Sequence, residues 1–259
     1  MDYKGKTALI TGASSGLGVA YAEEFAKRGS NLILVARRAD LLEQVGANIM
    51  KSTPVAITTI AMDLGTLEAG EQLVQAVASK SLQVDFLVNN AGFGTNNPLA
   101  KEDRTTIRQE IVLNVATLVD LTAAYLPPMK ARNFGAIINI ASTASYQPVP
   151  GMAVYGATKA FVRSFTSAVW GETEKTNVRV LTVSPGATAT AFFDVAGAKP
   201  AGALAPISNV MKTTFKALDA RRSRPAVIDG GANRFAAGLT TVLPKAFIIR
   251  TVARMFLKD

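Results

Sequence analysis

Short apolar runs alternate with longer segments of helical periodicity along most of this chain, and this alternation restricts the possible folds more than any other feature. Runs rich in Val, Ile and Leu, such as residues 31–36 and 178–184, are typical of parallel strands covered on both faces. Helical segments such as 16–28 lie between them and predict right-handed strand–helix–strand units. We therefore expect an α/β fold: a Rossmann-type, doubly wound parallel sheet in three α/β/α layers.

We expect residues 1–259 to form a single domain, because the length suits one α/β unit and about half of the residues are apolar. Expected strands occupy residues 6–11, 31–36, 55–62, 85–89, 136–141, 178–184 and 226–228. Expected helices occupy residues 16–28, 39–51, 67–79, 102–125, 155–175 and 207–220, the fourth ending near Pro127 and Pro128. The looser stretch 187–225 is predicted to act as a mobile substrate lid.

The chain contains neither Cys nor His. Disulfides, thiolate catalysis, Ser-His-Asp triads and histidine metal sites are therefore excluded, and we expect no metal. Acid–base chemistry near neutral pH must come from Tyr, Lys, Asp or Glu side chains whose pKa is shifted by their surroundings.

The first predicted strand ends in the glycine-rich turn TGASSGLG, which leads directly into a helix. Gly12, Gly16 and Gly18 would let the backbone turn tightly and approach a pyrophosphate, and the helix N-terminus attracts an anion. Alone, such a turn is a weak signal that a ligand-free connection also explains, but its position after the first strand favours a dinucleotide. The spacing of the glycines resembles the short-chain dehydrogenase/reductase family.

That resemblance implies a nicotinamide cofactor held by several strand ends. Asp63 resembles the acid that bonds the adenine amino group, although it could also cap the next helix. The Asn-Asn-Ala-Gly stretch at 89–92 and the Pro-Gly-x-x-x-Thr stretch at 185–190 also match family motifs. The residues assigned to the cofactor are Gly12, Ser14, Ser15, Gly16, Leu17, Gly18, Arg37, Arg38, Asp63, Leu64, Asn90, Ala91, Gly92, Tyr155, Lys159, Pro185, Gly186, Thr188 and Thr190.

The end of the second strand bears on the choice between NAD and NADP. An NAD-binding chain usually places an acid there for the ribose 2′-hydroxyl, but this chain has Ala36 followed by Arg37 and Arg38. Guanidinium groups suit a 2′-phosphate, and the family resemblance points Ser15 and Arg37 at it. We expect NADP(H) rather than NAD(H), although two arginines could also be a solvated helix start.

Tyr155 and Lys159 form the expected acid–base pair. They lie four residues apart in a predicted helix, so both side chains share one face. A free Tyr has a pKa near 10, and a nearby ammonium is expected to lower it. A Tyr with a Lys one turn away also arises by chance, so the pair needs companions.

The family resemblance supplies those companions in Ser142 and Asn114. Ser142 follows a strand and precedes Tyr155 at the family's spacing, where its hydroxyl would bond the substrate oxygen; Ser145 is a local competitor. Asn114 would hold a water in a proton relay through Lys159, although it could instead bond backbone within its own helix. The implied reaction moves a hydride between the nicotinamide and a carbonyl or secondary alcohol, with Tyr155 transferring the proton.

The expected substrate is a small molecule with a mainly apolar body. Segments 94–98, 143–152 and the stretch after Pro185 should contact it, and they offer Val149, Met152, Phe192 and Phe193, although the two Phe side chains could instead be core. The local sequence resembles the branch of ketoacyl reductases and hydroxysteroid dehydrogenases. The resemblance also implies a homodimer or homotetramer. The alternative is a catalytically silent protein that senses NADP(H), or a regulator at the membrane periphery.

The net charge of +9 is concentrated in the last quarter of the chain, where residues 195–259 hold eleven Lys or Arg and three Asp. Residues 232–259 interleave apolar and basic side chains, and Pro244 should interrupt their helix. Such a segment could pack on its own subunit, contact an acidic partner or lie on a membrane. No nucleic-acid motif accompanies the charge. With no targeting segment recognised, we expect a cytoplasmic protein, with peripheral membrane contact as an option.

Overall fold

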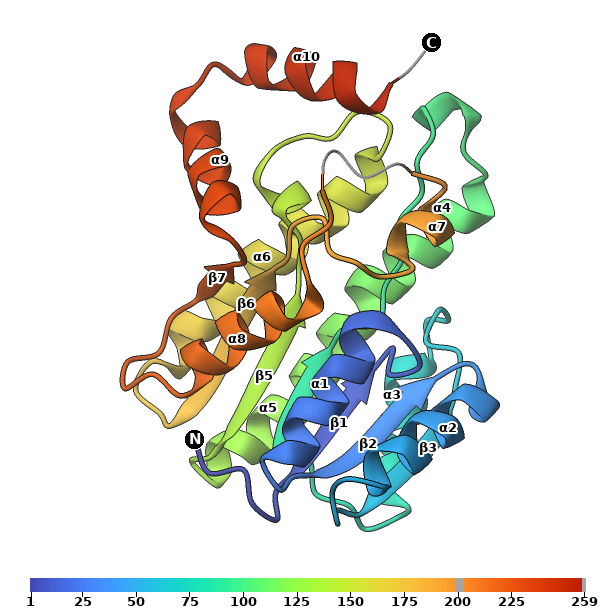
Figure 1. The fold of residues 1–259 in the computed structure, drawn as a ribbon, viewed down its shortest axis with the longest axis vertical. Coiled ribbons are helices and arrows are strands. Elements are labelled where there is room, and N and C mark those ends of the chain that lie inside the picture. The colour runs from blue at the N-terminus through green and yellow to red at the C-terminus, as the bar shows by residue number, and fades with distance from the viewer. Residues whose placement is uncertain (199–202, 258–259) are drawn as a thin grey trace.

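The chain folds around one parallel sheet. The computed structural model describes residues 1–198 and 203–257, and its strands follow the order β3-β2-β1-β4-β5-β6-β7 (Figure 1). The strands are β1 (Thr7–Thr11), β2 (Asn31–Ala36), β3 (Ile57–Ala61), β4 (Phe86–Asn89), β5 (Gly135–Ile140), β6 (Val178–Ser184) and β7 (Ala226–Ile228). The predicted Rossmann-type sheet is confirmed, and every strand lies within two residues of its expected bounds.

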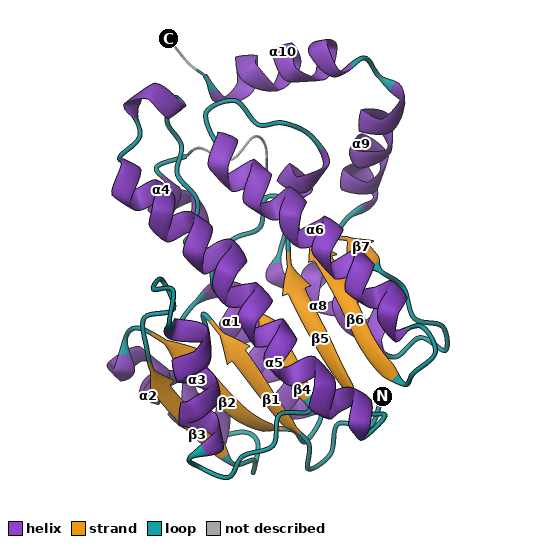
Figure 2. Cartoon of the chain, turned by 180° about the vertical axis from the view of Figure 1, so that it is seen from behind, coloured by secondary structure: helices purple, strands orange, loops and turns teal. Residues whose placement is uncertain are grey.

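Helices cover both faces of this sheet. Figures 1 and 2 show α1, α2 and α8 over one face and α3, α5 and α6 over the other. The helices are α1 (Gly16–Lys27), α2 (Ala39–Met50), α3 (Ala69–Ala78), α4 (Arg104–Ile111), α5 (Thr117–Ala131), α6 (Ala153–Thr173), α7 (Phe192–Ala196), α8 (Ile207–Leu218), α9 (Gly231–Val242) and α10 (Lys245–Phe256). Two 3₁₀ turns, Leu99–Lys101 and Thr143–Tyr146, and the π-helical turn Val112–Ala116 complete the described elements.

The strands carry apolar side chains on both faces, which is why two separate core clusters form. Ala8 and Ile10 of β1 join the cluster under α1 and α8, whereas Leu9 between them joins the cluster under α3 and α5. All three side chains are fully buried. The continuous apolar runs in the sequence are therefore explained by a sheet buried on both sides.

The prediction that the fourth helix ends near Pro127 and Pro128 is wrong, because α5 continues to Ala131 with both prolines inside it. Tyr125 and Met129, one turn apart, are buried in the core and hold the helix against the sheet. The two prolines lie on the exposed side of the helix. The backbone carbonyl groups that lose a hydrogen-bond donor there can be satisfied by water.

The continuous helical segment Arg104–Ala131 is, within the described part of the chain, the one helix long and apolar enough to cross a membrane. Its buried side chains, including Leu121 and Tyr125, belong to the core cluster of the sheet. Packing of this kind accounts for the apolar composition without a membrane.

The stretch expected to form a lid, 187–225, consists of two different parts. The first part includes α7, which lines the cavity described below, and the bridge between Thr188 and Ala205. Residues 199–202 of this part lie outside the described residues. The part from Ile207 onward is not a lid, because α8 buries Val210 and Phe215 in the core against α1. An amphipathic helix that supplies core side chains is part of the scaffold.

Residues 231–257, called here the C-terminal arm, form α9 and α10 beyond the end of the sheet (Figures 1 and 2). The predicted interruption at Pro244 is confirmed, because this residue precedes the first turn of α10. Of the expected basic segment 232–259, residues 258–259 lie outside the described part.

Candidate active site

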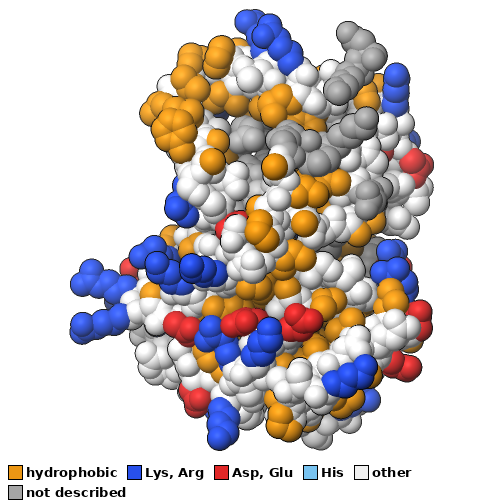
Figure 3. All heavy atoms as spheres, in the orientation of Figure 1, with side chains coloured by type: hydrophobic (Ala, Val, Ile, Leu, Met, Phe, Trp, Pro, Cys, Tyr) orange, Lys and Arg blue, Asp and Glu red, His pale blue; other side chains and the backbone are white. Residues whose placement is uncertain are grey.

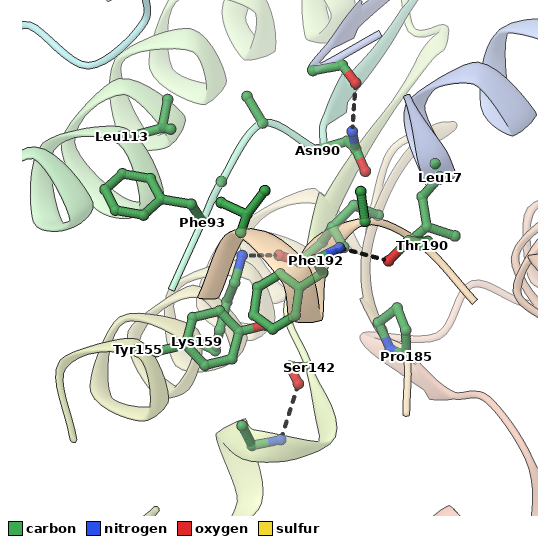
Figure 4. Close-up of a pocket in the computed structure, with 18 of the residues that line it drawn as sticks. Leu17, Asn90, Phe93, Leu113, Ser142, Tyr155, Lys159, Pro185, Thr190 and Phe192 are labelled. Atoms are coloured by element: carbon green, nitrogen blue, oxygen red, sulfur yellow. Dashed lines mark hydrogen bonds between the residues drawn. The ribbon is translucent and has the colours of Figure 1, made fainter. Parts of the chain in front are cut away.

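A cavity of about 620 Å³ opens at the carboxyl ends of the strands, beside the point where the order reverses between β1 and β4. Ligands of open α/β sheets bind at this position. Every residue that we predicted for catalysis or for the cofactor lines this cavity, apart from Gly18 and Asn114, which are buried. Side chains from separate parts of the chain converge there (Figure 4).

The glycine-rich turn between β1 and α1 is shaped by close backbone contacts. Gly12 and Gly16 have φ values of +66° and +56°, which L side chains rarely adopt. A Cβ on Gly18 would lie 2.1 Å from the carbonyl oxygen of Gly12, and a Cβ on Gly12 would lie 2.9 Å from Cα of Ala91. The turn therefore leaves bare backbone at the start of α1, a shape that fits a pyrophosphate.

The loop after β4 is fixed onto this turn by hydrogen bonds. Asn90 donates through Nδ2 to the carbonyl oxygens of Thr11, at 3.0 Å, and Gly12, at 3.3 Å. Oγ1 of Thr11 accepts from the backbone N–H groups of Asn90 and Ala91, both at 3.0 Å. The Asn-Asn-Ala-Gly motif thus holds two strand ends together at the floor of the cavity.

The ends of β2 and β3 present the groups expected for the adenosine half of a dinucleotide. Ala36 is buried, whereas Arg37 and Arg38 are exposed at the cavity and form no ion pair within the described residues. Asp63 accepts from the backbone N–H of Gly65 at 2.9 Å and does not cap α3, whose N-cap is Glu68. Two free guanidinium groups and no acid at the end of β2 suit a 2′-phosphate.

Tyr155 and Lys159 project from α6 into the cavity opposite the glycine-rich turn (Figure 4). Nζ of Lys159 lies 5.8 Å from the centroid of the Tyr155 ring and donates to the carbonyl oxygen of Ile140 at 2.9 Å. Ser142 accepts from the backbone N–H of Ala144 at 3.1 Å, which leaves its hydroxyl hydrogen free to donate. The competitor Ser145 is buried and does not line the cavity.

Burial dominates the protonation of this pair. It raises the pKa of Tyr155 to about 12, against a smaller lowering by the Ser142 hydroxyl, and lowers the pKa of Lys159 to about 8. The expected lowering of the Tyr155 pKa is therefore wrong for this structure, because burial and the Glu110 carboxyl both raise it. A pKa of about 12 keeps the Tyr155 hydroxyl protonated at neutral pH, so this group can donate a proton.

Asn114 lies in the π-helical turn Val112–Ala116 and links three elements. Its Nδ2 donates to the carbonyl oxygen of Phe93 at 2.8 Å and to Oγ1 of Thr158 at 3.1 Å, while Oδ1 accepts from the N–H of Phe93 at 3.2 Å. Bonding within its own helix, the alternative interpretation, is not what the structure shows. A Cβ on Gly92 would lie 2.7 Å from Oδ1 of Asn114 and 3.3 Å from Nζ of Lys159, so a glycine keeps these two groups close.

Glu110 was not predicted as a site residue, yet its carboxyl is fully buried one turn before Asn114. Oε2 accepts from the Thr95 hydroxyl at 3.2 Å, and Oε1 has no partner among the described residues. Burial raises the pKa of Glu110 to about 7, and the carboxyl acts electrostatically on both Lys159 and Tyr155. A carboxyl whose pKa is raised toward neutral therefore lies behind Tyr155 and Lys159.

The part of the cavity wall next to Tyr155 is apolar. The Phe192 ring packs against the Tyr155 ring with centroids 5.0 Å apart, and Val149 and Met152 join the same cluster. Phe192 and Phe193 both line the cavity, as predicted, but segment 94–98 does not. Val252, Met255 and Phe256 of α10 also line it and were not predicted. The helical spacing of Ile248, Val252, Met255 and Phe256 was visible in the sequence, but nothing there placed α10 over the site.

Comparison with known proteins agrees with this geometry. Residues 6–200 match the family described as short chain dehydrogenase. The chain is 36% identical over 190 residues to the very-long-chain 3-oxoacyl-CoA reductase of Bos taurus, a match covering 72% of this chain and 60% of that protein. This chain therefore spans less than two thirds of that relative.

Two solved structures are similar over nearly the whole chain. A short-chain dehydrogenase from Sphingobium yanoikuyae in complex with NADPH has 31% identity and a TM-score of 0.81, covering 93% of this chain and 97% of that one. A structure describing the stereoselectivity of 7beta-hydroxysteroid dehydrogenase has 26% identity and a TM-score of 0.87, covering 98% of this chain and 100% of that one.

Proposed function

The chain belongs to the short-chain dehydrogenase family, and we propose that it is an NADP(H)-dependent reductase of an apolar carbonyl compound. The observation that carries this proposal is the convergence of Ser142, Tyr155 and Lys159 on one wall of the cavity that also holds the glycine-rich turn. A donor for the substrate oxygen, a proton donor and a cation thus face a dinucleotide-shaped cradle.

NADP(H) is proposed as the cofactor because the residues present fit it. The turn from Gly12 to Gly18 would hold the pyrophosphate, and Arg37 and Arg38 would hold the 2′-phosphate. The NADPH bound in the similar Sphingobium yanoikuyae enzyme supports this choice. When bound, the nicotinamide supplies or accepts the hydride.

The protein's own groups bind the substrate oxygen and move the proton. Ser142 donates its hydroxyl hydrogen to the carbonyl oxygen and stabilises the charge that develops there. Tyr155 then transfers its phenolic proton to that oxygen, and Lys159 stabilises the resulting phenolate. Asn114 bonds both Phe93 and Thr158, and so fixes the loop before Gly94 relative to the helix that carries Lys159. We assign it to the path through Lys159 by which Tyr155 regains a proton.

The proposed substrate class is a ketone or 3-oxoacyl compound with an apolar body. Phe192, Val149, Met152 and α10 provide an apolar surface next to Tyr155, which favours burial of a hydrocarbon portion. The name of the Bos taurus relative, a 3-oxoacyl-CoA reductase, supports an oxoacyl thioester as one member of the class.

The proposal is tested by following NADPH oxidation with a panel of ketones, aldehydes and 3-oxoacyl thioesters of increasing chain length. We expect turnover with at least one class and a KM that falls as the apolar portion lengthens. NADPH binding in a direct titration, with no turnover on any carbonyl compound, would contradict the proposal and favour a cofactor-sensing protein.

A further inference from the structure

The C-terminal arm exposes an unusual amount of apolar surface. In the whole arm, only Ala237 and Val252 are buried. Three of its large apolar side chains are more than half exposed outside the cavity: Phe235 at 70%, Val242 at 75% and Phe247 at 58%. Figure 3 shows apolar side chains gathered over α9 and the start of α10. An apolar area of this kind usually marks a surface that is covered in the functional protein.

The charge of the arm has one sign. Arg234, Lys245, Arg250 and Arg254 are exposed, and no Asp or Glu occurs from residue 230 to residue 257. Figure 3 shows Lys and Arg side chains projecting at the outer end of the molecule around α10. Apolar side chains interleaved with cations are the composition of helices that lie in the interface of an anionic membrane.

One stripe of side chains on α10 faces the cavity, so the two sides of this helix can serve different purposes. Ile248, Val252 and Phe256, spaced one turn apart, pack with the cluster around Tyr155. Phe247, Arg250 and Arg254 are not in that stripe and remain exposed. The arm is therefore a cavity wall on one side and an unpartnered cationic, apolar surface on the other.

We propose that the C-terminal arm docks on an anionic lipid bilayer, with the exposed apolar side chains in the interface and the Lys and Arg side chains at the headgroups. A second copy of the chain fits this surface less well, because a twofold contact would face cations with cations and offer no acid. Since α10 also walls the cavity, docking places the cavity next to the bilayer. If the proposed function holds, an apolar substrate would be supplied from there.

Vesicle co-sedimentation of the full chain tests this proposal without any turnover, so its failure is distinguishable from failure of the proposed reductase. We expect binding to vesicles of phosphatidylcholine with phosphatidylglycerol, much weaker binding to phosphatidylcholine alone, and loss of binding at high salt. Replacing Arg250 or Arg254 by Gln should each weaken binding about fivefold.

Two apolar variants and a matched control locate the surface. Phe235→Asp and Phe247→Asp should each weaken binding by at least about tenfold, since a carboxylate then enters the interface. Leu67→Asp, at a side chain 67% exposed outside the cavity lining, should bind like the parent. All three positions are exposed, and circular dichroism of each variant checks that it is folded.

The proposal is overturned if the parent does not sediment with anionic vesicles, or if both Phe variants bind as well as the parent. It is also overturned if analytical ultracentrifugation without lipid shows that Phe247→Asp dissociates an oligomer while vesicles never bind. That result would make the arm an interface between copies. Should a Phe variant misfold, the two Arg variants and the lipid-charge comparison still decide the outcome.

Discussion

Glu110→Gln should make the stability of the cofactor-free protein less sensitive to pH. The Glu110 carboxyl is fully buried, and burial raises its pKa in the folded state from 4.5 to about 7. Glu102 adds like charge, while Lys159 and the Thr95 hydroxyl act in the opposite direction. The contribution of Glu110 to stability is therefore complete below about pH 4.5 and is lost as the pH rises through about 7.

The size of this effect follows from the two pKa values. A shift of one unit corresponds to about 1.36 kcal/mol, so full titration removes roughly 3 kcal/mol. Between about pH 5.5 and about pH 8.5, the loss attributable to Glu110 is roughly 2 kcal/mol. Gln keeps an acceptor for the Thr95 hydroxyl but does not ionise, so Glu110→Gln should not lose stability in this way.

Urea unfolding followed by circular dichroism at those two pH values measures the difference. Lys159 titrates in both proteins, so the pH-dependent change in the free energy of unfolding of the variant is subtracted from that of the parent. The exposed substitution Glu43→Gln on α2 should leave the pH dependence of the parent intact. Equal pH dependence in the parent and Glu110→Gln would refute the account of a buried, neutral carboxyl.

Three further predictions concern the cavity. Arg37→Ser should raise the KM for NADPH by about tenfold or more and leave the KM for NADH nearly unchanged, since a charge-assisted bond is worth about 1.5–3 kcal/mol. Steady-state kinetics with both cofactors measures the two KM values. Equal changes in them would mean that Arg37 only belongs to a solvated helix start. Gly18→Ala should abolish measurable NADPH binding in a fluorescence titration, because its Cβ would lie 2.1 Å from the Gly12 oxygen; unchanged affinity would mean that the turn does not hold the cofactor. Phe192→Ala should raise KM for the most apolar substrate several-fold with little effect on kcat for a small ketone; a uniform fall in kcat would instead make Phe192 a support for Tyr155.

The fold was predictable because its strands are buried on both faces. β2, β6 and β7 have the expected bounds, since their apolar runs are cut off by polar or glycine-rich turns. The prediction that the helix ends near Pro127 and Pro128 was wrong because the free-energy cost of a proline within a helix depends on which side of the helix it lies. Their exposed position, set by the burial of Tyr125 and Met129, is a property of the packed structure.

Most of the predicted cofactor residues could be found because they follow strand ends, which the sheet brings together. Tyr155, Lys159 and Asn114 lie on helical segments and were found from their spacing in the family motifs. Glu110 could not be found, because a single Glu in a polar helical turn carries no sign of burial. Its environment is created by Thr95 and by the packing of α4 against α6, which are distant in sequence. The position of α10 over the cavity was unpredictable for the same reason, as it rests on contacts with Val149 and Met152.

Isotope transfer tests the central claim most directly. With the best carbonyl substrate from the panel and NADPH deuterated at C4, on each face in turn, the parent should place deuterium from one face on the carbinol carbon of the product. Tyr155→Phe should bind NADPH with unchanged affinity and form no labelled alcohol, because no group then supplies the proton. Labelled alcohol formed by Tyr155→Phe at the parent's rate, or a parent product without label, would contradict the account.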